Sequence, residues 1–201
     1  VISGFENPYD FFYASNETSA FPYPNVMLWI LALPRLLASP FMGLDYQDVS
    51  YAHIFVYRLP MLVADIIIFL IFIRWFKTKQ NKVLLYYWCS PILFYISYVH
   101  GQLDVLPIML LFIFLYFLFL EKWYWAFAFL GLAISAKTAM AVVFPFALVY
   151  IVVKKIDIKE VLALISIPLA TFLVINSNYL LSPGFINLVL KTKEQMKIFD
   201  F

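Results

Sequence analysis

A short polar stretch, "SYVHGQLDVLP" at residues 97–107, lies between two long apolar runs. It brings together His100, Gln102 and Asp104, and Gly101 allows a tight turn between them. The imidazole can accept a proton, the amide can donate and accept hydrogen bonds, and the carboxylate accepts them, so the set suits a hydroxyl-rich ligand. The same residues also fit a polar loop that caps two helix ends, with Asp104 near a helix N-terminus. The residues alone leave both interpretations open.

Two basic residues stand within or beside other apolar runs. Lys137 lies between "LAIS" and "AMAVVFP", and a charge at membrane depth is costly unless it meets a partner or an anionic ligand. The alternative is that Lys137 pairs with Asp104 or Asp65 and only holds helices together. Arg58 and Asp65 are seven residues apart and share a helix face. For this pair we favour a tie between helices, and Arg58 could also meet a phosphate.

The composition indicates the elements that must position these residues. The 201 residues are 65% hydrophobic and 13% charged, with a mean hydropathy of +0.90, which is far from the balance of a soluble domain. Backbone groups in a bilayer must be satisfied within helices or a closed barrel, and the long apolar runs favour helices. The net charge of +2 is too small to indicate nucleic acid. We therefore predict an all-α, polytopic transmembrane helix bundle.

A helix needs about 20 apolar residues to cross a bilayer. The candidate spans are 57–76, 83–99, 103–120, 123–153 and 161–181. Pro91 predicts a kink in the second of them. The run 123–153 is interrupted by Lys137 and Pro145, so we expect two shorter helices that form a hairpin. The total is about five to six membrane helices.

The opening third of the chain predicts an outer loop. Residues 26–42 are apolar but contain Pro34 and Pro40, which indicates a helix in the membrane interface. We predict a single membrane domain with three parts: an outer loop with interfacial helices (1–56), transmembrane helices (57–181) and an outer-face tail (182–201). Because the chain begins with Val1 on a polar, aromatic loop, we expect at least one membrane helix upstream of it.

Basic residues predict the orientation, because cytoplasmic loops are rich in lysine and arginine. One loop holds four of them: Arg74, Lys77, Lys79 and Lys82. If that loop is cytoplasmic, alternation of the spans puts His100, Asp104 and Lys137 on the outer side. The candidate functional residues would then share one face of the membrane.

Four stretches, in order, carry a resemblance to a known family. They are "NPYDFF…FPYPNVMLWILALP", "YRLPMLVADIIIFLIF", "SPILFYISYVHGQLDVLPIMLLF" and "GLAISAKTAMAVVFPFALV". Together they resemble the GT-C superfamily of integral-membrane glycosyltransferases, in the mannosyltransferase-like branch that uses polyprenyl-phosphate sugars. The resemblance implies a bundle of membrane helices, a first outer loop with an essential acidic residue, and a second acidic motif after the third helix of the conserved module.

By position, "HGQLD" resembles the second acidic motif, which implies catalytic roles for His100 and Asp104. The resemblance implies substrate-binding roles for four other residues: Gln102, Lys137, Arg58 and Asp10. The family's first acidic residue follows its first membrane helix, so we expect the principal acid upstream of residue 1. We expect no cofactor, and the dependence on a divalent metal is left open, since "HGQLD" alone lacks the ligands of a convincing divalent-metal site.

The implied activity is transfer of a hexose, with mannose favoured, from a polyprenyl-phosphate donor to a lipid or glycan acceptor. Expected partners are these substrates and membrane lipids, with no nucleic acid. We expect an integral, multi-pass membrane protein, located in the plasma membrane of a prokaryote or the endoplasmic reticulum of a eukaryote. A transporter or flippase for a lipid-linked sugar is the alternative, although the sequence predicts only one interrupted helix, around Lys137, where transporters often have a pair. A structural membrane subunit would leave the outer polar cluster unexplained.

Overall fold

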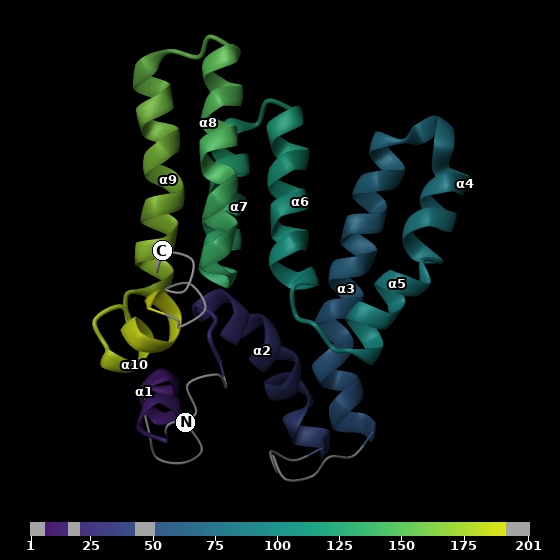
Figure 1. The fold of residues 1–201 in the computed structure, drawn as a ribbon, viewed down its shortest axis with the longest axis vertical. Coiled ribbons are helices and arrows are strands. Elements are labelled where there is room, and N and C mark those ends of the chain that lie inside the picture. Colours follow the sequence, from purple (N-terminus) through teal and green to yellow (C-terminus); the bar gives the residue numbers. More distant parts are fainter. Residues whose placement is uncertain (1–6, 16–20, 43–50, 192–201) are drawn as a thin grey trace, which may run out of the picture. The chain divides into compact units, whose positions relative to one another are not determined.

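The computed structural model describes residues 7–15, 21–42 and 51–191. The elements of these residues (Figure 1) are α1 (Pro8–Ala14), α2 (Asn25–Met42), α3 (Tyr51–Trp75), η1 (Lys77–Lys79), α4 (Gln80–Val83), η2 (Leu84–Trp88), α5 (Pro91–Phe94), η3 (Tyr95–Val99), α6 (Val105–Phe119), α7 (Trp123–Ala136), η4 (Thr138–Val143), α8 (Phe144–Val153), α9 (Ile158–Asn176), α10 (Pro183–Phe185) and η5 (Ile186–Leu190). Every element in these three ranges is helical. The predicted all-α class is therefore confirmed.

Three helices within the described ranges are long and apolar enough to cross a membrane: α2, α3 and α9. Shorter apolar helices cover Val105–Phe119, Trp123–Ala136 and Thr138–Val153. The chain therefore has the character of a membrane protein. The helix α2 continues through both Pro34 and Pro40, although each proline removes one helical hydrogen bond. Its predicted place in the interface stays a prediction.

The chain divides into two compact units, which are described separately. One unit comprises residues 28–130, and the other comprises residues 1–27 with 131–201. The predicted single membrane domain over residues 1–201 stays a prediction.

In the unit of residues 28–130, α3 packs along α6. The buried residues of α6 include Leu106, Leu110, Phe114 and Leu118, which follow one another at intervals of four and so line one face. Aromatic rings extend the contact at one end, where the centroids of Phe72 and Phe112 are 4.9 Å apart. Many other large apolar side chains of α3 are exposed, as expected for surfaces that face lipid.

The predicted span 83–99 is interrupted in the same unit. The helical segment that ends at Trp88 is followed by Cys89 and Ser90, and α5 begins at Pro91. Ser90 is extended, with ψ of 116°, because the residue before a proline is sterically pushed out of the helical region. Its side chain accepts a hydrogen bond from the amide of Leu93. The predicted kink at Pro91 is thus a complete break, and π-helical turns, η2 and η3, lie on either side of it.

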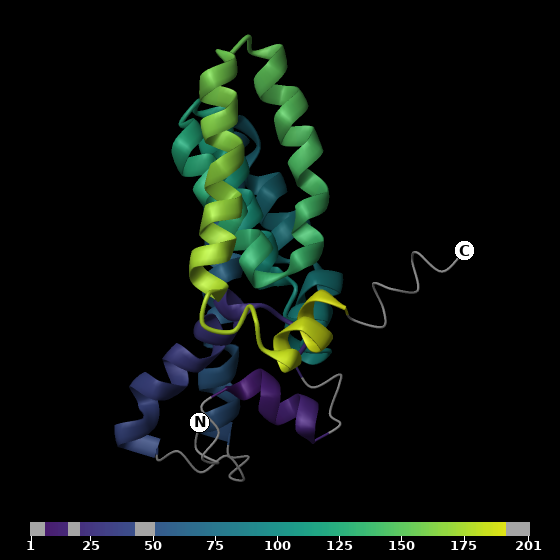
Figure 2. The ribbon, with the colours of Figure 1, turned by 90° about the vertical axis from the view of Figure 1, so that its left-hand side faces the viewer.

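In the other unit, α8 and α9 lie side by side and run in opposite directions (Figure 2). The predicted interruption of 123–153 is confirmed, because Lys137 is extended (φ −150°, ψ 117°) between α7 and η4. Gly131 of α7 allows close packing against α9, since a Cβ there would lie 2.7 Å from the Cβ of Thr171 and 2.8 Å from the Cα of Pro168.

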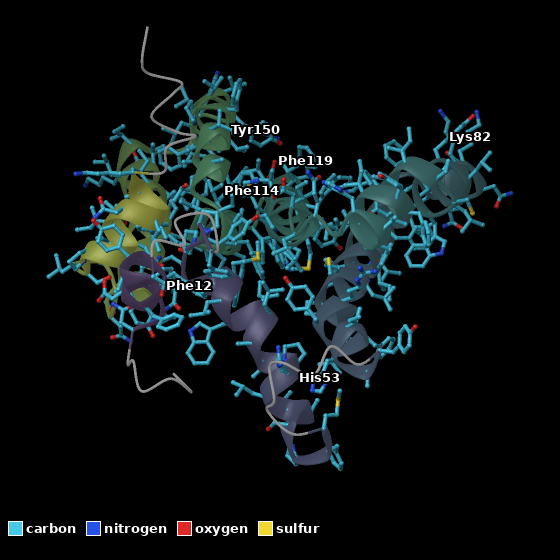
Figure 3. All side chains as sticks on the ribbon, turned by 60° about the horizontal axis from the view of Figure 1, so that its bottom comes forward. Phe12, His53, Lys82, Phe114, Phe119 and Tyr150 are labelled. Carbon is cyan, nitrogen blue, oxygen red and sulfur yellow. The ribbon has the colours of Figure 1, made fainter. Side chains whose placement is uncertain are left out.

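A second core in this unit joins α1 to α10 and η5. Its buried members are Tyr9, Phe185, Leu188 and Val189. The rings of Tyr9 and Phe185 meet edge to face with centroids 5.0 Å apart, and Phe12 packs against the cluster (Figure 3). The short helix α1 is held by this aromatic packing, since a helix of this length is marginal by itself.

Candidate functional site

The "HGQLD" segment forms a turn between η3 and α6. Gly101 has a φ of +76°, a left-handed conformation that glycine adopts without the steric cost of a Cβ. The amide of His100 donates to the carbonyl of Tyr95 at 2.8 Å, and the amide of Gln102 donates to the carbonyl of Ile96 at 3.1 Å. These bonds close the end of η3 and direct the chain into α6. The tight turn expected at Gly101 is confirmed.

The polar side chains of the turn are accessible. His100 and Gln102 are exposed, and the ring of His100 stacks on Tyr95 with 6.4 Å between centroids and 12° between planes. Asp104 stands at the N-cap position of α6, but its side chain makes no capping hydrogen bond. The expected place of Asp104 near a helix N-terminus is therefore observed, but its side chain makes no capping hydrogen bond there.

Arg58 and Asp65 of α3 both hold Tyr98, two residues before His100. The guanidinium of Arg58 donates to the backbone carbonyl of Tyr98, and the Tyr98 hydroxyl donates to Asp65 at 2.6 Å. The other oxygen of Asp65 accepts a 2.9 Å hydrogen bond from the hydroxyl of Tyr87. Arg58 and Asp65 thus tie α3 to the helical segments on both sides of Pro91, as the sequence favoured. Their bonds to Tyr98 also position the chain that leads into the turn.

A cavity of about 280 Å³ adjoins this tie. Its lining residues are Leu62, Asp65, Tyr87, Trp88, Leu93, Phe94 and Tyr98. The aromatic members come from both sides of the break at Pro91 and were not among the predicted site residues. The sequence did contain a signal, since aromatic residues cluster on both sides of Pro91 in "YYWCSPILFYISY" at residues 86–98.

Lys137 lies at the helix break of the other unit. Its amide donates to the carbonyl of Ala133 at 2.9 Å, and its carbonyl accepts from the amide of Met140 at 3.0 Å. The side chain is half-buried. The next residue, Thr138, lines an apolar cavity of about 500 Å³ whose other walls come from Ile134, Ala141, Phe144, Pro145, Ile165, Pro168, Leu169 and Phe172. Lys137 thus immediately precedes, in the sequence, a residue that lines an apolar cavity.

Asp10 makes contacts within its own unit. One carboxylate oxygen accepts a 2.7 Å hydrogen bond from the side-chain amide of Asn7, and the other accepts one of 2.7 Å from the backbone amide of Gly184. Both oxygens are therefore used to join α1 to the start of α10. The substrate-binding role predicted for Asp10 stays a prediction, and the geometry adds a structural role.

Tyr9, next to Asp10, is fully buried. Its hydroxyl donates to the carbonyl of Tyr23 at 3.1 Å. Burial raises the pKa of this hydroxyl, and the neighbouring Tyr179 raises it further, because the phenolate would lose hydration. Tyr9 is therefore held as a neutral donor.

A buried asparagine pair was also missed by the sequence interpretation. The side-chain oxygen of Asn176 accepts a 3.0 Å hydrogen bond from the amide of Asn25, whose own side chain donates to the carbonyl of Ile175 at 2.7 Å. Asn176 also donates to the carbonyl of Phe172 at 2.8 Å. The pair fastens the start of α2 to the end of α9.

In the three described ranges, no group of three or more histidine, cysteine, aspartate or glutamate side chains is arranged to hold a metal ion. Comparison of the chain with protein-family models, curated proteins and solved structures found no match.

Proposed function

We propose that the chain belongs to an integral-membrane glycosyltransferase of the GT-C type. It would move a hexose, with mannose favoured, from a polyprenyl-phosphate donor to a lipid or glycan acceptor at the outer or luminal face. The membrane would be the plasma membrane of a prokaryote or the endoplasmic reticulum of a eukaryote. The observation that carries the proposal is Asp104, an acid that occupies the N-cap position of α6 without capping it, next to the exposed side chains of His100 and Gln102.

The chemistry follows from the types of these residues. In the transfer, the acceptor oxygen forms a bond to the anomeric carbon, and the bond from that carbon to the phosphate oxygen breaks. The proton of the acceptor hydroxyl passes to a carboxylate, for which Asp104 is the candidate, and His100 is the second candidate. The phosphate leaves with the bonding electrons, and a cation such as Lys137 would stabilise its charge.

Arg58 can contribute to the same task while it keeps its structural bond. A guanidinium has five N–H donors, and one of those of Arg58 is used on the carbonyl of Tyr98. Gln102, with one amide that both donates and accepts, suits the hydroxyl groups of a hexose.

The test is product analysis with the protein in detergent, supplied with polyprenyl-phosphate mannose or polyprenyl-phosphate glucose and a membrane lipid extract as acceptor. If Asp104 is the general base, Asp104→Asn should slow transfer about 10²–10⁴-fold, and Lys137→Ala should also slow it. Asp157→Asn is the matched control, because Asp157 is an exposed N-cap residue of α9 and asparagine caps helices equally well. Normal turnover in both test variants at normal expression would refute these roles.

A second candidate function is a transporter or flippase for a lipid-linked sugar. Transporters often contain discontinuous helices in corresponding halves, and the described part of this chain has interruptions at Cys89–Ser90 and at Lys137. The same anion-binding residues would then act without chemistry. In liposomes, a donor that crosses the bilayer intact and yields no product with any acceptor would support this alternative over sugar transfer.

A further inference from the structure

The cavity beside Asp65 has the chemistry of a cation site. One carboxylate and four aromatic residues, Tyr87, Trp88, Phe94 and Tyr98, contribute to its wall. Aromatic faces attract organic cations through the negative charge of their π-systems, and aromatic cages of this kind recognise quaternary ammonium groups. The remaining lining residues, Leu62 and Leu93, are apolar.

The charge of Asp65 is only partly accounted for by its neighbours. Asp65 lies well inside the apolar helix α3, where a carboxylate is costly and is usually paired or functional. Within the described part of the chain, its contacts are the two tyrosine hydroxyls, and Arg58 donates to a backbone carbonyl instead. A bound cation would provide the opposite charge.

The aromatic walls are held by packing outside the cavity. The ring of Trp88 lies 5.2 Å from that of Phe69, and the ring of Tyr87 lies 5.3 Å from that of Phe72. Two of these aromatic residues, Tyr87 and Trp88, stand in the π-helical turn η2, and π-helical turns occur frequently at functional sites. Trp88 and Phe94 are also 43% and 60% exposed, so the cavity is open to a ligand from outside the protein.

We propose that this cavity binds an organic ammonium cation, with Asp65 as the counter-charge and the four aromatic rings as the cage. Its volume of about 280 Å³ is at the lower end for small-molecule sites, which suits a small head such as trimethylammonium. The cation could be a free amine or the headgroup of a lipid. The inference stands apart from sugar transfer, since none of the four cage residues was proposed to contact the sugar, its phosphate or the acceptor; Tyr98 only positions the polar turn.

The experiment uses the full chain in phosphatidylglycerol nanodiscs, which contain no choline lipid. Saturable binding of labelled choline is measured by equilibrium dialysis, and 3,3-dimethylbutan-1-ol, the neutral carbon isostere of choline, is the competitor that lacks the charge. We expect unlabelled choline to displace the label at about tenfold lower concentration than the isostere. Dihexanoylphosphatidylcholine distinguishes the two sources: stronger displacement than by choline indicates a lipid headgroup, and weaker displacement indicates a free cation.

Two variants test the assignment of the residues. Asp65→Asn removes the charge and should weaken choline binding about tenfold, and Trp88→Leu removes a cage wall and should weaken it severalfold. Asp157→Asn, in the other unit, is the matched control and should bind as the parent does. If Asp65→Asn does not fold, Trp88→Leu still decides the question. Equal displacement by the neutral isostere, unchanged binding in the test variants, or a lack of saturable binding to choline and to the lipid would overturn the proposal.

Discussion

The Tyr98 hydroxyl donates a 2.6 Å hydrogen bond to the carboxylate of Asp65, across 33 positions of sequence. Arg58 binds the backbone carbonyl of the same tyrosine. Tyr98 is therefore held at both its main chain and its side chain by one face of α3. Because His100 follows two residues later, this contact fixes the start of the polar turn that carries Asp104.

Tyr98→Phe should loosen that turn. The change removes the hydrogen bond to Asp65 and leaves the contact with Arg58, so we expect a loss of about 1–3 kcal/mol in the free energy of unfolding. If the turn holds the reacting groups, the rate of sugar transfer should fall as well. Thermal unfolding in detergent and the transfer assay check the two effects. Tyr95→Phe is the control, because Tyr95 is 57% exposed and the variant keeps the ring that stacks on His100. Equal effects of Tyr98→Phe and Tyr95→Phe would contradict the proposed role of the hydrogen bond to Asp65.

Asn176→Ala should destabilise the unit that contains α9. The change leaves the buried amide of Asn25 without its acceptor, which costs about 1–3 kcal/mol. Asn187→Ala is the control, since Asn187 donates only an exposed hydrogen bond to the carbonyl of Pro183. Denaturation midpoints of the two variants measure the difference. Equal midpoints for the two variants would contradict a stabilising role for the buried hydrogen bond between the Asn176 side chain and the backbone amide of Asn25.

Gly184→Ala should separate α1 from α10. A Cβ at this position would lie 2.4 Å from the carbonyl carbon and oxygen of Tyr9, and backbone atoms cannot move aside as a flexible side chain can. We expect a loss of about 1–3 kcal/mol or more and faster proteolysis within α1. Gly101→Ala has nothing within 4 Å of the new Cβ, so it should cost only the left-handed strain of about 1–2 kcal/mol. Limited proteolysis that spares α1 equally in both variants would count against the close contact.

Because Tyr9 is buried, we expect the free energy of unfolding to depend on pH at alkaline values. Burial raises the pKa of its hydroxyl in the folded chain, whereas the unfolded residue ionises near its usual value of about 10. The stabilisation is therefore complete below about pH 10 and is lost as the pH rises above it, because the unfolded state then releases a proton that the folded state retains. Tyr9→Phe should flatten the fall in unfolding free energy above pH 10, and Tyr13→Phe, at an exposed position of α1, should not. Identical alkaline slopes for the parent and Tyr9→Phe would contradict the prediction.

The helices and their interruptions could be predicted from the sequence. The apolar runs predicted the helices α3, α6 and α9 to within a few residues of most ends, because hydrophobic length and composition act locally. Pro91 and the pair Lys137 and Pro145 marked both interruptions, since proline restricts its own backbone and that of the residue before it. The break at Cys89–Ser90 was nevertheless stronger than the predicted kink.

Only part of the candidate site could be predicted from the sequence. The polar turn with His100, Gln102 and Asp104 stood out because polar residues are rare in this chain. Neither the cage around Asp65 nor the use of both Asp10 oxygens could be predicted, because each depends on which distant segment packs beside the acid.

The sequence by itself determined a helical membrane chain, the positions of its breaks and the polar turn at Gly101, because these depend on composition and on the backbone preferences of single residues. Only the tertiary structure decided which groups meet. Asp10 binds Gly184 across 174 positions, and Asn25 binds Asn176 across 151. No local period encodes such pairs, since their geometry is created when whole helices pack and the polar groups they bury must find partners.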